Sequence, residues 1–182
     1  MKKRVLVILI LLVAFKINAQ QDPQYTQYMY NMNVINPAYA GSNDGVSFGF
    51  LYRDQWEGLE GAPKTATMNV HFPAGRNVGL GFSAIADEIG PVSETNLYID
   101  FSYTLNFSND NRLAFGVKAG GTFHDVGLAN LTLIDQNDPF FAADINENTP
   151  NVGAGVYFYK PNSYYISVSV PNILESVHLD NN

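Results

Sequence analysis

The stretch Thr95–Leu105, TNLYIDFSYTL, alternates between apolar and polar side chains along its whole length. One face carries Leu97, Ile99, Phe101, Tyr103 and Leu105, and the other carries Asn96, Tyr98, Asp100, Ser102 and Thr104. A period of two is typical of a β-strand with two different faces, whereas a helix needs a period near 3.6. The stretch therefore predicts a strand.

Six further stretches alternate in the same way. They are residues 46–52, 65–72, 78–86, 113–123, 152–158 and 164–170. None of them has a helical period, and no stretch beyond the N-terminus approaches the roughly eighteen apolar residues that a transmembrane helix needs. The chain is therefore predicted to be all-β, with seven antiparallel strands joined by turns.

Alternation alone fits two architectures. A soluble sandwich, or a lipocalin-like barrel, has its apolar row inside, whereas an outer-membrane barrel turns that row toward lipid. The polar rows favour the membrane, because they hold Gly, Ser, Thr and Asn instead of the Lys and Glu typical of a solvated face. Aromatic residues at 157–159 and 164–165 flank a turn, as in an interfacial girdle, although ordinary hairpin packing would give the same cluster.

The lengths of the predicted connections also favour a membrane barrel. Connections at 57–63, 88–94 and 126–150 would lie outside, and those at 73–77, 106–112 and 160–163 would be periplasmic. The longest falls outside and the two shortest inside, as membrane barrels show. Seven strands are too few to close a bacterial barrel, which has an even number of about eight or more. We therefore predict a partial, N-terminal half barrel over residues 45–182, with a dimer of half barrels as the alternative.

Residues 1–19 have the pattern of a secretion signal. Lys2, Lys3 and Arg4 precede an apolar run at 5–15, which is too short to span a membrane, and cleavage is predicted near Ala19. The mature chain would hold six basic residues (10 − 4) against seventeen acidic ones, a net charge of −11. This excess argues against nucleic acid as a partner, because phosphate binding needs Lys and Arg. The chain has no cysteine, so we expect neither disulfides nor a lipoprotein anchor.

Between the signal and the first strand lies an aromatic segment at residues 20–44. Its central part, DPQYTQYMYNMNVINPAYAGS at 22–42, has four tyrosines but only one charge. We expect it to be ordered against the strands, with a flexible leader as the alternative. It would plug the lumen or offer a docking surface to periplasmic machinery. The candidate residues are Tyr25, Tyr28, Met29, Tyr30, Asn36, Pro37, Tyr39 and Gly41.

This segment resembles the N-terminal signature of the PorP/SprF family, outer-membrane proteins of the type IX secretion system in Bacteroidota. The matching motifs are DPQY-x-QYMYN at 22–31 and INPAYAGS at 35–42, followed by YR-x-QW at 52–56 and GAP-x-T at 61–65. The resemblance covers most of the mature chain. Members of the family usually run well past this length, with the barrel continuing.

The resemblance implies a non-enzymatic function. Such proteins help deliver or anchor secreted proteins at the cell surface, including adhesins in gliding species. The implied partners are a secreted cargo protein, periplasmic secretion subunits and outer-membrane lipid. A passive pore for small solutes is the alternative.

The remaining candidate sites are few. If Leu105 faces Leu113 across the 108–111 turn, Asp100 faces Lys118 in the lumen, and exchanging both charges together should restore what Asp100→Lys alone disrupts. Two unrelated lumen charges are the alternative. The loop Asp135–Glu147 is rich in oxygen ligands, but it lacks the EF-hand pattern and is best explained as a solvated acidic loop. No catalytic arrangement surrounds His71, His124 or His178, so we expect neither an enzyme, a cofactor nor a bound metal.

Overall fold

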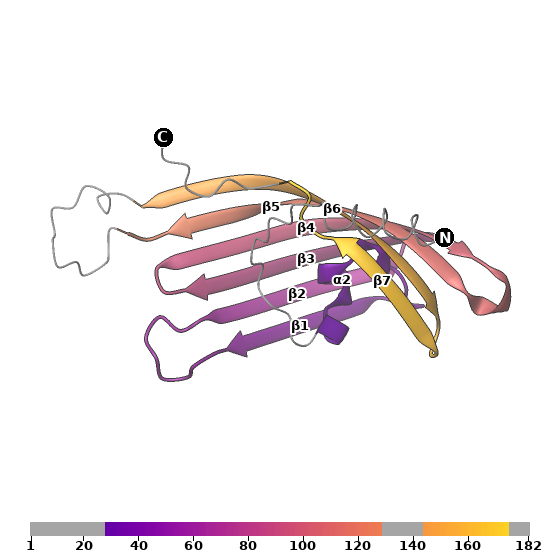
Figure 1. Cartoon of the computed structure of the whole chain (residues 1–182), viewed down its shortest axis with the longest axis horizontal. Coiled ribbons are helices and arrows are strands. Elements are labelled where there is room, and N and C mark those ends of the chain that lie inside the picture. Colours follow the sequence, from indigo (N-terminus) through magenta and orange to yellow (C-terminus); the bar gives the residue numbers. More distant parts are fainter. Residues whose placement is uncertain (1–27, 129–143, 175–182) are drawn as a thin grey trace, which may run out of the picture.

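The computed structural model describes residues 28–128 and 144–174, and within them seven strands form one antiparallel sheet. Each strand pairs with its neighbours in chain order, and the sheet curls into a half barrel (Figure 1). The all-β prediction and all seven strands are confirmed. The strands are β1 (Ser47–Asp54), β2 (Lys64–Pro73), β3 (Val78–Ile89), β4 (Val92–Asn106), β5 (Arg112–Val126), β6 (Ile145–Lys160) and β7 (Tyr164–Val170).

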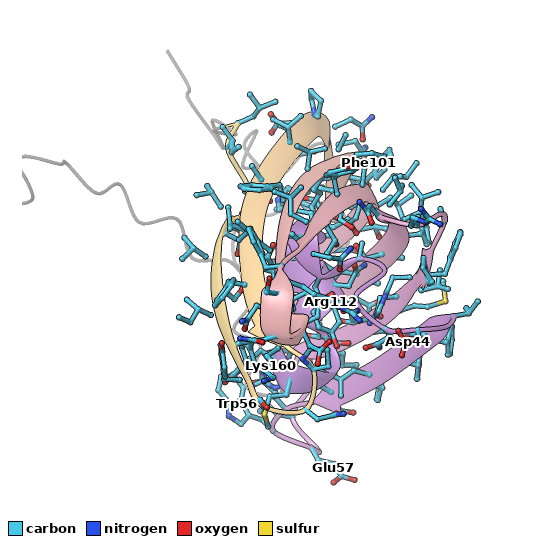
Figure 2. The ribbon with its side chains drawn as sticks, turned by 90° about the vertical axis from the view of Figure 1, so that its right-hand side faces the viewer. Asp44, Trp56, Glu57, Phe101, Arg112 and Lys160 are labelled. Carbon is cyan, nitrogen blue, oxygen red and sulfur yellow. The ribbon has the colours of Figure 1, made fainter. Side chains whose placement is uncertain are left out.

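The two faces of the sheet are inverted relative to a soluble protein. On β4, Ile99 on the convex face is 64% exposed, whereas its neighbour Asp100 on the concave face is fully buried. Figure 2 shows Phe101 on the outer side of the curl. The rest of the sheet repeats the pattern, with exposed Phe48, Phe50, Met68, Phe115, Val117, Ile166 and Val168 and buried Thr67, Asn69, His71, Ser83, Ser102 and Lys118. An apolar outer face around a polar interior is the arrangement of a membrane barrel.

Several strands extend further than their sequence patterns predict. β3 and β4 pair up to Ile89↔Val92, so the predicted connection at 88–94 shrinks to Gly90 and Pro91. This correction removes part of the predicted difference in loop length between the two ends of the barrel. β6 begins at Ile145, although residues up to Pro150 were predicted as loop. Proline is tolerated there because β7 pairs with residues 154–160, so Pro150 lies beyond the β6–β7 ladder and its missing N–H costs no hydrogen bond to β7.

The part of residues 20–44 that the structure describes folds into three short helices against the sheet. They are η1 (Tyr28–Tyr30), α2 (Met32–Ile35) and η2 (Pro37–Tyr39). In η2 the side chain of Asn36 accepts a hydrogen bond from the Ala38 N–H and Pro37 holds the first position, which is favourable N-terminal chemistry. A further short helix, η3 (Ser108–Asp110), joins β4 to β5. No helix among the described residues is long and apolar enough to cross a membrane.

The small apolar core lies between the N-terminal helices and the concave face of the sheet. Buried Met32 and Ala38 pack with Ala114 of β5 and with Tyr157 and Tyr159 of β6, and Tyr39 packs against this cluster. The concave face is therefore covered by the chain's own N-terminal segment over β4, β5 and β6, the strands that η2 contacts.

Candidate functional site

Three buried asparagines fix the N-terminal segment to four different strands. The Oδ1 atom of Asn31 accepts a hydrogen bond from Asn69 Nδ2 of β2 at 2.9 Å. Asn33 Nδ2 donates to Asp100 Oδ2 of β4 at 3.0 Å. Asn36 Nδ2 donates to the carbonyl oxygen of Val156 on β6 at 3.1 Å and to Ser167 Oγ on β7 at 2.8 Å. We call residues 31–41, held in this way, the docked segment.

The sheet also binds the backbone of the docked segment. Ser102 Oγ donates to the Ala40 carbonyl at 2.6 Å, and His71 Nδ1 accepts from the Gly41 N–H at 3.2 Å. Lys118 Nζ donates to the Val34 carbonyl. A buried backbone group without a partner is costly, so side chains of the sheet replace the secondary-structure bonds that this irregular segment lacks.

The predicted pair of lumen charges lies at the centre of these contacts. Asp100 and Lys118 are direct partners in the β4–β5 register, and Lys118 Nζ lies 3.7 Å from Asp100 Oδ1. Both side chains are almost completely buried. Each also contacts the docked segment, Asp100 through Asn33 and Lys118 through Val34. The charges therefore join the segment to the sheet as well as β4 to β5.

Glycines in the sheet give the docked segment room to approach. A Cβ atom placed on Gly116 of β5 would lie 2.1 Å from the Ala38 nitrogen, and one on Gly79 of β3 would lie 2.0 Å from the Ala40 carbonyl oxygen. Real Cβ atoms do not approach so closely, so any other residue at either position would displace the segment. A small residue where another backbone comes close is a known use of glycine in strands.

Aromatic rings close the end of the docked segment. Tyr39 makes edge-to-face contacts with His71 of β2 at 5.2 Å and with Tyr157 of β6 at 5.3 Å between ring centroids. Tyr157 stacks on Tyr159 at 4.7 Å, and the Arg112 guanidinium lies 5.9 Å from the centre of the Tyr159 ring. Such pairs add to the stability given by burial alone.

The predicted residues of the segment divide into buried and exposed sets. Asn36 and Pro37 are buried, Tyr39 packs on the core, and Gly41 adopts a positive φ of 68° beside Gly79. Tyr28 and Met29 are exposed on η1, which also contains Tyr30. Tyr25 lies outside the described residues, as do the predicted signal and most of the acidic loop from Asp135.

Sequence reasoning missed Asn31 and Asn33, and on the sheet it missed His71 and Ser102. The sequence does place three asparagines close together in a segment without charged residues. Polar side chains in such a segment need hydrogen-bond partners when it is buried, so these asparagines were candidates for contacts with the sheet. The partners themselves come from strands far along the chain, and no local pattern reveals them.

The side chains of the site make binding contacts with the docked segment. Within 28–128 and 144–174, no group of three or more His, Cys, Asp or Glu residues could hold a metal ion. The side chains of the concave face that contact the docked segment are amides, hydroxyls, a histidine, one buried ion pair and tyrosines.

Comparison with known protein families points to a membrane protein, as does the apolar outer face of the sheet. The model of the family described as type IX secretion system membrane protein PorP/SprF matches residues 17–182. The chain belongs to the PorP/SprF family. This chain is therefore a membrane component of type IX secretion, and membership of the family implies interaction with other components of that system. Neither the curated proteins nor the solved structures gave a match.

Proposed function

We propose that this PorP/SprF chain is a non-enzymatic outer-membrane component that helps to deliver or anchor a secreted protein at the cell surface. The observation that carries this proposal is the docked segment. It covers the concave face of the half barrel and is fixed to β2, β4, β6 and β7 by asparagine side chains. A passive pore needs an open lumen, so a lumen occupied by the protein's own segment favours a scaffold that holds a partner protein.

The partners divide between the two ends of the strands. A segment that follows a secretion signal begins in the periplasm, so exposed Tyr28 and Met29 would face periplasmic secretion subunits. The opposite end, with the β1–β2 and β3–β4 connections, would face the cell exterior and the secreted cargo (Figure 1). A surface adhesin is the kind of cargo that the family resemblance suggests.

Deletion of the gene tests the proposed function. We expect one surface protein, or a small set, to disappear from the cell surface and to be found in the medium or inside the cell. The purified protein should show little conductance in planar bilayers, because the docked segment covers the concave face. An unchanged surface proteome together with steady conductance would favour the passive pore instead.

A further inference from the structure

Charge is distributed unequally between the two ends of the strands. At the end with the β1–β2, β3–β4 and β5–β6 connections, the described residues hold nine acids and only two basic residues, Arg53 and Lys64. The acids are Asp54, Glu57, Glu60, Asp87, Glu88, Glu94, Asp125, Asp144 and Glu147. The opposite end has Asp44 and Asp110 against Arg76, Arg112 and Lys160. We call the first end the acidic end.

Exposed apolar side chains lie within this acidic end. Trp56 is 69% exposed and Leu59 is 61% exposed in the β1–β2 loop, and Ile89 is half exposed at the end of β3. The loop is tied to the β3–β4 turn by a hydrogen bond from the Gly90 N–H to the Gly61 carbonyl at 3.0 Å. Glu57 and Glu60 are next to these apolar side chains in sequence, and Glu57 projects away from the sheet (Figure 2). Large exposed apolar residues bordered by charge are typical of interaction sites.

We propose that the acidic end is a docking surface for a polypeptide segment in which basic side chains accompany apolar ones. The apolar residues of that segment would cover Trp56 and Leu59, and its Lys or Arg side chains would meet the surrounding carboxylates. Charge complementarity selects this partner over a lipid surface, because nine acids and two basic residues repel anionic head groups. The inference rests on the proposed function and names the chemistry of the partner.

Trp56 is the only tryptophan in the sequence, so its fluorescence reports on this surface directly. The test uses the chain in lipid nanodiscs and a synthetic peptide of alternating Lys and Leu, with a peptide of alternating Glu and Leu as the control. We expect only the basic peptide to shift the Trp56 emission to shorter wavelength. Its affinity should fall about tenfold between roughly 50 and 500 mM salt, because salt screens exposed charges.

Matched variants show whether the acidic end is responsible. The double variant Glu57→Gln and Glu60→Gln should weaken peptide binding, whereas Asp44→Asn, at the opposite end, should leave it unchanged. Equal binding of both peptides, or equal effects of the variants, would overturn the proposal. Strong quenching of Trp56 by brominated lipid, with no response to the basic peptide, would show instead that Trp56 anchors the chain in the membrane.

The proposed function has a separate readout. If the gene deletion removes a surface protein but the peptide does not bind, the delivery role stands and the docking surface is wrong. If the peptide binds but the deletion leaves the surface proteome unchanged, the role itself is wrong.

Discussion

At the residue scale, single side chains decide whether the docked segment stays in place. Asn36 makes three hydrogen bonds, to the Val156 carbonyl, to Ser167 and from the Ala38 N–H, and it is completely buried. Its removal would leave the buried Ala38 N–H without this partner, at a cost of about 1–3 kcal/mol, and would also remove the partly buried bonds to Val156 and Ser167. An exposed asparagine with a single side-chain bond should matter far less.

We predict that Asn36→Ala releases the docked segment and lowers the free energy of unfolding by about 2–4 kcal/mol. Asn43→Ala is the matched control, because Asn43 bonds to Ser47 Oγ at 2.7 Å on the surface. Protease cleavage within residues 31–41 measures release, and urea unfolding in detergent measures stability. Equal effects of the two substitutions would contradict the role given to Asn36.

The buried ion pair gives a second prediction. Lys118→Met should destabilise the protein by about 3–5 kcal/mol, because it leaves Asp100 buried without its counter-charge. Adding Asp100→Asn should recover part of that loss, and a double-mutant cycle in urea measures the coupling. Exchanging the two charges should recover only part of the lost stability, and not all of it as the sequence alone predicted, because the pair also binds Asn33 and Val34. Additive single effects would show that the two charges act independently.

At the element scale, the docked segment and the sheet fit each other through small residues. We predict that Gly116→Ala displaces η2, because the new Cβ would lie 2.1 Å from the Ala38 nitrogen. Gly75→Ala is the control, since a Cβ there would meet nothing within 4 Å. Gly116→Ala should raise both the bilayer conductance and the protease sensitivity of the segment. If Gly116→Ala leaves both unchanged, the close approach is not required.

Local patterns predicted the elements well and their contacts poorly. Alternation located all seven strands, because each strand has two chemically different faces along most of its length. It missed the first residues of β6, where Asn, Glu and Pro imitate a loop and only pairing with β5 maintains the strand. The Asp100–Lys118 register could be counted across one short turn. The partners of Asn31, Asn33 and Asn36 could not be predicted by counting residues, because they lie 38 to 131 residues away in the sequence.

At the scale of the whole molecule, the distribution of apolar and polar side chains over the two faces of the sheet fits a lipid environment. Its convex face exposes aromatic and aliphatic side chains, and its concave face buries amides, hydroxyls and an ion pair. In water this distribution would favour aggregation, whereas in a bilayer it satisfies both faces. The chain belongs to the PorP/SprF family of type IX secretion system membrane proteins, and this membership agrees with a convex face that contacts lipid.

We predict that charge on the convex face is penalised according to depth. Phe101→Lys, in the middle of β4, should cost about 2–4 kcal/mol of stability in the membrane, whereas Phe107→Lys, beyond the end of that strand, should cost about 0–1 kcal/mol. Unfolding in urea from lipid vesicles measures both values. Equal costs at the two positions would show that the convex face does not lie across a bilayer.

The central claim is that the chain's own N-terminal segment occupies the concave face, and cross-linking in the native membrane tests it most directly. The sequence has no cysteine, so engineered pairs have no background. Asn31→Cys with Asn69→Cys places thiols at two side chains that lie 2.9 Å apart, whereas Asn31→Cys with Phe101→Cys places them on opposite faces of the sheet. We predict that a short thiol cross-linker joins the first pair and leaves the second unjoined. Failure to join the first pair, or equal joining of both, would contradict the claim.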